Sequence, residues 1–173
     1  MTAYVALLRA VNVGGTGKLP MTDLKAMCEA AGLTQVRTYI ASGNVVFTSE
    51  KSEAEVRAAI EAPLETYAGK PVGVLIRSAA EMDALVEANP FSDRPGNRTV
   101  ALFVDAPLSQ AVISAAKNVK DEEMRLGHRA IYISYGAGMA DSRLSIPAAK
   151  AGTARNMNSV TKLAEMAKIL SQQ

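Results

Sequence analysis

The chain has no tryptophan, one cysteine and one histidine among its 173 residues, and these scarcities exclude several kinds of site. One cysteine cannot form an internal disulfide and is compatible with a reducing cytoplasm. A zinc site normally takes three or four His, Cys or carboxylate ligands, so no His/Cys cluster can form. Cys28 shares an apolar helical stripe with Leu24 and Met27, which predicts a core residue and not a nucleophile. His128 follows Gly127 between two strand-like runs, as expected in a hairpin turn.

Long apolar runs and an excess of charge are also missing. No run approaches the roughly 20 residues that cross a bilayer. Arg9 interrupts the apolar N-terminal stretch, which also lacks the basic leader of a signal peptide. The net charge of +2 is too small to indicate nucleic-acid binding by itself. With 49% hydrophobic and 21% charged residues, the chain resembles an ordinary soluble globular protein. We therefore expect a cytoplasmic protein without a membrane partner.

The first part of the chain, residues 1–77, predicts the order βαββαβ of a split βαβ or ferredoxin-like unit. The expected elements are a strand over 3–9, a helix over 20–31, a hairpin of strands 35–40 and 44–49, a helix from residue 52 and a strand over 72–76. Ser52 and Glu55 form a capping-box pattern at the start of the second helix. Pro63 inside that helix predicts a kink or an early end near Ala62.

The remainder, residues 78–173, continues without a free linker and predicts a second, smaller α+β half that is closely packed on the first. Ser78 and Glu81 form another capping-box pattern. A strand over 99–104, a helix over 108–116, a hairpin at Gly127 and a terminal helix over 158–171 should follow. No internal repeat is obvious in the residues. The predicted fold class is α+β, with an antiparallel sheet in which the strand of residues 3–9 is central.

Four sequence blocks resemble those of a known family. The blocks are ALLRAVNVGG, RTYIASGNVVF, NPF and TARNMNSVTKL, and the resemblance runs from about residue 4 to residue 168. They resemble the proteins of domain of unknown function 1697 (DUF1697), found mainly in bacteria. The resemblance implies an α+β fold with ferredoxin-like parts and no established activity. Met157 stands where the family commonly has tryptophan, so the resemblance carries no role for an aromatic ring there.

Polar residues gather in the two loops that should follow the first and second strands. Those strands run parallel in a βαββαβ unit, so both loops lie at one edge of the sheet. The start of the first helix also lies there, and its free N–H groups favour anions. The sequence therefore predicts an anion-binding edge, to which these residues contribute: Arg9, Asn12, Gly14, Gly15, Lys18, Ser42, Gly43 and Asn44. Tight turns alone also explain the glycines and asparagines.

A second polar block stands at the start of the predicted terminal helix and contains Thr153, Arg155, Asn156 and Asn158. Capping explains one asparagine. An arginine often only covers surface with its stem. We predict instead that the block completes the same site, with the Arg155 guanidinium meeting a phosphate or carboxylate. Arg155 should then lie near the loop of residues 9–15 or the turn of residues 42–44.

Two familiar kinds of site do not fit. A P-loop placed on Gly17 and Lys18 would need glycine at Asn12 and a hydroxyl at Leu19. An RNA-recognition sheet would need exposed aromatics on its central strands. Tyr4 could be one, but the first strand is apolar on both faces and should be covered on both.

Two functional hypotheses remain open. The first is a protein or enzyme that acts on a small anionic ligand, and the second is a non-catalytic nucleic-acid or protein interaction module. Nucleic acid is not the expected partner. The sequence decides neither cofactor nor oligomeric state.

Overall fold

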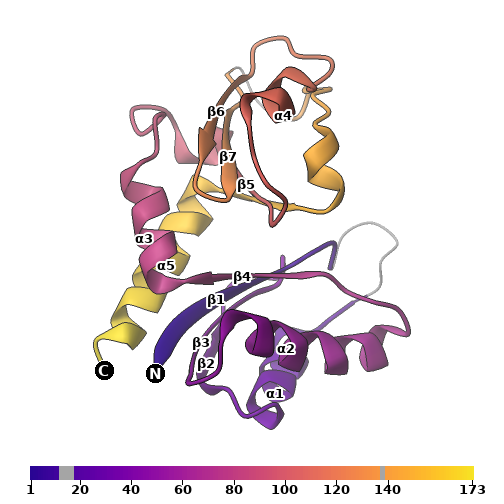
Figure 1. Cartoon of the computed structure of the whole chain (residues 1–173), viewed down its shortest axis with the longest axis vertical. Helices are drawn as coiled ribbons and strands as arrows, with labels where there is room; N and C mark the ends of the chain where they lie inside the picture. The colour runs from indigo at the N-terminus through magenta and orange to yellow at the C-terminus, as the bar shows by residue number, and fades with distance from the viewer. Residues whose placement is uncertain (12–17, 137–138) are drawn as a thin grey trace. The chain divides into compact units, whose positions relative to one another are not determined.

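A computed structural model of the chain describes residues 1–11, 18–136 and 139–173, and it divides them into two compact units. Unit 1 comprises Met1–Asp83 and Leu163–Gln173, and unit 2 comprises Ala84–Lys162. Each unit contains one four-stranded antiparallel sheet with helices, which confirms the predicted α+β class (Figure 1).

The elements of unit 1 follow the predicted order. They are β1 Thr2–Leu8, α1 Met21–Ala30, β2 Thr34–Thr38, β3 Asn44–Ser49, α2 Glu53–Ala68, β4 Val74–Ser78 and the start of α3 Ala79–Glu87. The strands lie in the order β2-β3-β1-β4, and every neighbouring pair is antiparallel. The central position of β1 is the one that the ferredoxin-like interpretation requires.

Both faces of β1 are buried, as its apolar sequence predicts. Tyr4 and Leu8 point into a core that α1 and α2 complete on one side of the sheet (Figure 1). Val5 and Leu7 alternate to the opposite face and are 0% exposed. The Tyr4 ring packs at 5.7 Å from that of Phe47 inside the core. The central strand therefore presents no aromatic platform for bases.

Helix α2 confirms one expectation and contradicts two. The capping box is formed, because the Ser52 hydroxyl accepts from the Glu55 amide and the Glu55 carboxylate accepts from the Ser52 amide. The predicted early end near Ala62 is wrong, since the helix continues through Pro63 to Ala68, and a kink at the proline stays a prediction. Pro63 and Ala59 line an open groove, so water can reach the helix where the proline lacks its N–H. Tyr67 follows Ile60 and Leu64 at helical spacing, which predicts an inward side chain, but it is 48% exposed because it lies in the last turn, beyond the core.

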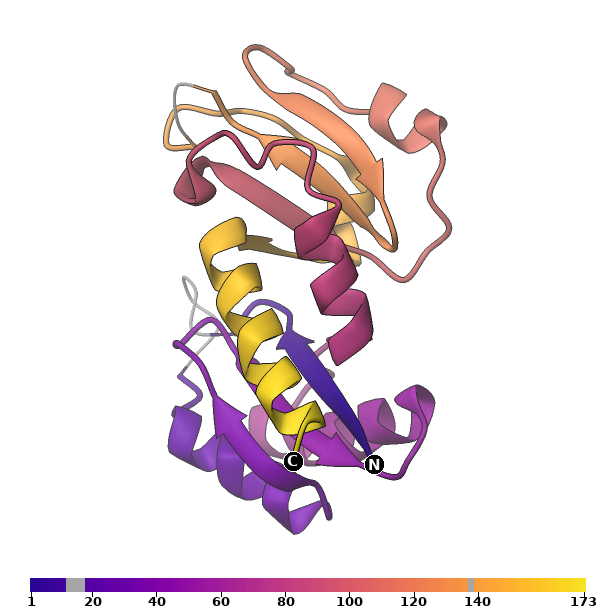
Figure 2. The same cartoon turned by 90° about the vertical axis from the view of Figure 1, so that its left-hand side faces the viewer.

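The last part of α5, whose bounds are Met157–Ser171, belongs to unit 1. Its buried positions are Leu163, Ala164, Ala167 and Leu170, spaced as an amphipathic helix requires. Both chain ends lie side by side in the two views (Figure 2). The Gln173 side chain accepts a hydrogen bond of 3.1 Å from the Gln35 side chain, which ties the C-terminus to β2.

Unit 2 contains a second sheet. Its elements are the end of α3, η1 Gly96–Arg98, β5 Thr99–Phe103, α4 Gln110–Ser114, β6 Glu123–Gly127, β7 Ala130–Ser134, η2 Pro147–Lys150, β8 Thr153–Asn156 and the start of α5. The strand order is β6-β7-β5-β8, again antiparallel throughout. Leu102, Ile131 and Ile133 form its apolar cluster with half-buried side chains from α4. The β6–β7 turn contains His128, as predicted.

Residues 153–156 correct the sequence interpretation, because they form β8 and not the opening of a helix. The strand pairs with β5, where Ala101 lies opposite Arg155 and Phe103 opposite Thr153. Thr153 and Arg155 are two residues apart in a strand, so both point to one face of the sheet. Their polar side chains concealed this pairing in the sequence.

The apolar periodicity of the sequence predicts nine core residues in particular, and the structure confirms that all nine are buried. Every side chain in this set is at most 4% exposed: Leu7, Leu24, Val46, Phe47, Ile60, Leu75, Leu85, Leu102 and Leu163. Cys28 is 0% exposed, and burial raises the pKa of its thiol to about 12. Such a thiol is neutral at physiological pH, so Cys28 is a packing residue.

Candidate ligand-binding site

The edge of the first sheet where β1 and β2 end is held together by backbone hydrogen bonds. The Leu8 amide donates to the Gly43 carbonyl, and the Arg9 amide donates to the Gly73 carbonyl, both at 2.9 Å. Gly43 has a φ of 89°, and a Cβ there would lie 2.6 Å from Cγ2 of Val11. The position therefore requires glycine for both conformation and space.

Two polar residues of the β2–β3 turn serve its architecture. Asn44 is 0% exposed, and its side-chain amide donates to the Tyr39 carbonyl at 2.8 Å and to the Ser42 hydroxyl at 2.9 Å. These bonds satisfy buried polar groups that would otherwise destabilise the turn. A ligand contact for Ser42, Gly43 and Asn44 stays a prediction.

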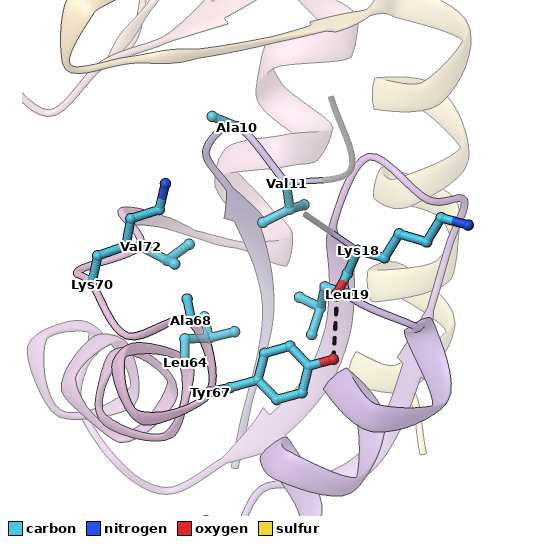
Figure 3. Close-up of a pocket in the computed structure, with 9 residues that line it drawn as sticks. All are labelled: Ala10, Val11, Lys18, Leu19, Leu64, Tyr67, Ala68, Lys70 and Val72. Carbon is cyan, nitrogen blue, oxygen red and sulfur yellow. Dashed lines mark hydrogen bonds between the residues drawn. The ribbon is translucent and has the colours of Figure 1, made fainter. Parts of the chain in front are cut away.

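Beside this edge lies a pocket of about 220 Å³ (Figure 3). Its wall combines the residues after β1, the residues before α1, the last turn of α2 and the segment that leads into β4. These lining residues are Ala10, Val11, Lys18, Leu19, Leu64, Tyr67, Ala68, Lys70 and Val72. The pocket thus occupies the sheet edge at which the sequence predicts a site.

The chemistry of the pocket is divided between floor and rim. Val11, Leu19 and Leu64 are buried and form an apolar floor. The charged side chains among the described lining residues are Lys18 and Lys70, both exposed. In Figure 3 their ammonium groups lie at the outside of the pocket, while the aliphatic side chains face its interior.

Tyr67 and Arg9 fix the surroundings of the pocket. The Tyr67 hydroxyl donates to the Lys18 carbonyl at 3.3 Å, which links the end of α2 to the segment before α1 (Figure 3). The stem of Arg9 lies against Gly73, where a Cβ would come within 2.9 Å of the arginine Cδ. Arg9 thereby remains half-buried directly after β1.

The second predicted block belongs to unit 2. Arg155 is 7% exposed, and its guanidinium donates to the Thr153 hydroxyl at 2.7 Å and to the Ala154 carbonyl at 3.0 Å. Burial lowers the pKa of Arg155 to about 10, so it still carries its charge at neutral pH. Asn156 caps α5, because its side-chain oxygen accepts from the Ser159 amide at 2.9 Å. Asn158 packs against Gly96.

The structure therefore brings the predicted residues together in two groups. Arg9, Lys18 and the turn of residues 42–44 belong to unit 1, whereas Thr153, Arg155, Asn156 and Asn158 belong to unit 2. Asn12, Gly14 and Gly15 lie outside the described residues. A single site composed of both groups stays a prediction.

Sequence reasoning missed the part of the pocket that α2 provides. Leu64, Tyr67 and Ala68 read as one end of an amphipathic stripe, and Lys70 reads as a surface charge after the helix. One feature of the sequence could have indicated this part of the pocket: Tyr67 and Lys70 stand on either side of Gly69, which ends the helix. That signal does not reveal which loop faces the helix end.

A larger hollow, of about 460 Å³, lies in unit 2 and has mixed charge. Lys120 and Arg143 line it together with Asp121, Glu122 and Asp141. The buried Glu122 carboxylate accepts from the Ser142 hydroxyl and the Lys120 amide, and these bonds lower its pKa, the Ser142 bond most. These carboxylates oppose the entry of an anion.

Within residues 1–11, 18–136 and 139–173, no group of three or more His, Cys, Asp or Glu side chains could hold a metal ion. In the same described part, none of the helices combines the length and apolarity needed to cross a bilayer.

The profile of a protein family with the description "Protein of unknown function (DUF1697)" matches residues 1–132. The chain belongs to this DUF1697 family. The match covers unit 1 up to α3 and continues to β7, whereas β8 and α5 lie beyond it. The resemblance seen in the sequence is thereby confirmed.

The fold is also similar to a solved structure, that of the conserved bacterial protein SP0830 from Streptococcus pneumoniae. That chain is 26% identical, with a TM-score of 0.79, and the similarity covers 96% of this chain and 98% of the other. Among curated proteins, no significant match is found. The similarity extends over both units and therefore includes β8 and α5.

Proposed function

We propose that the protein binds a small anionic ligand in the pocket of unit 1 lined by Lys18 and Lys70. The observation that carries the proposal is the presence of these two lysines among the lining residues of a concave site at the loop edge of the sheet. Ligand sites are concave and place a few polar groups around an apolar surface. A lysine ammonium group on its flexible stem suits an anion that enters from solvent.

The electrostatics around the rim support an anion. Lys70 follows Gly69, the left-handed cap residue at the C-terminal end of α2. A helix C-terminus carries partial negative charge, which by itself opposes an anion, and the adjacent Lys70 offsets it. Lys18 then adds positive charge at the other side of the pocket, and Arg9 lies in the neighbouring loop. Because both lysines are exposed, each should contribute modestly and the contribution should decrease with salt.

The proposal can be tested by calorimetric titration of the full chain with small phosphate and carboxylate compounds. The double variant Lys18→Gln/Lys70→Gln removes both rim charges. Its matched control, Lys25→Gln/Lys162→Gln, removes two exposed charges elsewhere. We expect the control to bind as the natural chain does and the rim variant to lose at least tenfold in affinity. Equal affinity in both variants would contradict the proposal.

A short oligonucleotide provides the comparison with the interaction-module hypothesis. Nucleic-acid affinity should fall by orders of magnitude between low and moderate salt, because many counterions are released. A small anion held by two lysines should lose much less over the same range. Tight, steeply salt-dependent oligonucleotide binding without any small-anion binding would favour the interaction module and contradict the pocket proposal.

A further inference from the structure

We infer that the ligand of this pocket joins its anionic group to a short apolar body, an inference that rests on the proposed function. The floor is the reason. Leu64 is 1% exposed, Leu19 6% and Val11 8%, so they close the base of the pocket, while the more exposed Tyr67, Ala68 and Val72 leave apolar surface that a ligand can contact. A wholly polar anion such as inorganic phosphate would leave that surface in contact with water.

The position of the charges fixes the orientation of the ligand. In Figure 3 the ammonium groups of Lys18 and Lys70 extend away from the apolar lining in different directions, whereas the aliphatic side chains and the Tyr67 ring lie between them. The apolar body therefore enters first and the anionic group remains at the opening. The hydrogen bond from the Tyr67 hydroxyl to the Lys18 carbonyl holds the ring as one wall, so the ring is pre-positioned for an apolar contact.

The size of the pocket limits the apolar body. At about 220 Å³ it is smaller than the roughly 300–1,000 Å³ of sites for drug-sized ligands. Each methylene group that leaves water for the floor should tighten binding by about fourfold. This gain should stop once the pocket is full, because additional carbons would extend into solvent.

A series of straight-chain carboxylates from acetate to octanoate tests the inference by calorimetry. We expect affinity to rise by about fourfold per carbon and then to level off within the series. Hexyl phosphate shows whether the anionic group is preferentially carboxylate or phosphate, and neutral hexanamide measures the contribution of charge. Weak binding of hexanamide is expected.

The variant Ala68→Leu fills the pocket from the last turn of α2, at an exposed position where leucine is compatible with the helix. Ala58→Leu is the matched control on the same helix and lies outside the pocket. We expect Ala68→Leu to abolish the dependence on chain length while acetate binding is retained. The control should keep the full dependence.

The outcomes separate the inference from the proposed function. If all carboxylates bind equally and Lys18→Gln/Lys70→Gln weakens them all, the anion site stands and the apolar body is contradicted. If neutral hexanamide binds as tightly as hexanoate, the proposed anion site is contradicted. Chain-length dependence that survives Ala68→Leu would place the apolar contact elsewhere and overturn the inference.

Discussion

The two units share a strand order but differ in the helices that cover their sheets. When the strands of each unit are counted along the chain, both sheets have the order second, third, first, fourth. In unit 1 the connections contain α1, of 10 residues, and α2, of 16 residues. In unit 2 the corresponding connections contain α4, of 5 residues, and η2, of 4 residues. Strand pairing therefore defines this topology even where the helical layer is reduced.

The correspondence extends to the end of each fourth strand. Arg77 in β4 lies opposite Val5, and Arg155 in β8 lies opposite Ala101, at matching positions of the two sheets. Both arginines are buried, and each donates to the carbonyl of the residue before it. Ser78 and Asn156 follow them, and each accepts from the amide three residues later. Arg155 thus has a structural counterpart, which the ligand hypothesis for this residue must take into account.

The difference between the helical layers explains where the pocket lies. The last turn of α2 extends to the residues that follow β1 and contributes Leu64, Tyr67 and Ala68 to the lining. In unit 2 the 4-residue η2 occupies the place of α2 in the chain order. A long second helix is thus the feature that gives the loop edge of unit 1 an apolar floor.

The largest expected effect is on stability, and it is tested by truncating one isoleucine in each unit. Ile60 is 1% exposed beneath the first sheet, whereas Ile113 in α4 is only half-buried. Ile60→Ala should lower the free energy of unfolding by ~2–5 kcal/mol, because it leaves a cavity in a packed core. Ile113→Ala should cost less than half of that. Chemical denaturation of both variants measures the difference, and equal losses would show that the short helix is packed as tightly as α2.

A second comparison concerns two glycines of unit 1. Gly43→Ala combines a positive φ of 89° with contacts of 2.6 and 2.9 Å to Val11 and Leu8, and we expect a loss of ~2–4 kcal/mol. Gly69→Ala also has a positive φ, of 73°, but its Cβ would meet nothing within 4 Å. It should therefore cost only ~1 kcal/mol. Thermal unfolding of both variants measures the gap, and no difference between them would remove the steric part of the explanation.

The third expectation concerns Cys28 and alkaline pH. Its folded pKa of about 12 lies above the roughly 8.5 expected for the unfolded chain. Above the lower value the unfolded chain releases the proton and the folded chain retains it, so stability falls as pH rises. The slope should be ~1.4 kcal/mol per pH unit between these values. Urea unfolding of the natural chain between pH 8 and pH 10.5 should show this decrease in the free energy of unfolding. The decrease due to the thiol should be absent from Cys28→Ala. Identical slopes would mean that the thiol ionises in the folded state.

The smallest expected effect is the loss of stability when the serine at the start of a helix is replaced, and α2 and α4 should differ in it. Ser52 at the start of α2 has both capping-box bonds, whereas Ser109 at the start of α4 makes no side-chain capping bond. Ser52→Ala should destabilise by ~1 kcal/mol, and Ser109→Ala should be nearly neutral. Denaturant midpoints for the two variants suffice to decide. A substantial loss at Ser109 would indicate that the short helix depends on its start more than its geometry suggests.

Sequence patterns predicted unit 1 better than unit 2 for a physical reason. Long amphipathic helices and apolar strands leave periodic patterns, so β1, α1, α2 and the core positions could be recognised. The matching strand order in unit 2 was concealed, because α4 and η2 are too short to show a helical period. β8 was misread as the start of a helix because its buried face contains Thr153 and Arg155 where apolar residues are expected.

The candidate site was predictable only in part. The loop edge could be located because turn residues and the parallel arrangement of β1 and β2 specify it. Lys18 was among the residues predicted to lie there. Leu64, Tyr67 and Val72 could not be assigned, because their approach to Val11 and Leu19 is a tertiary contact across more than forty residues of sequence. Local patterns contain no information about which helix end faces which loop.

The proposed function requires that the pocket of unit 1, with its two lysines and apolar floor, is the ligand site. A hexanoate titration of isotope-labelled protein, followed by the backbone amide resonances, tests this most directly. We expect saturable shifts concentrated at residues 10–11, 18–19 and 64–72. Shifts concentrated at residues 153–158 of unit 2, or no saturable shifts up to millimolar hexanoate, would contradict it.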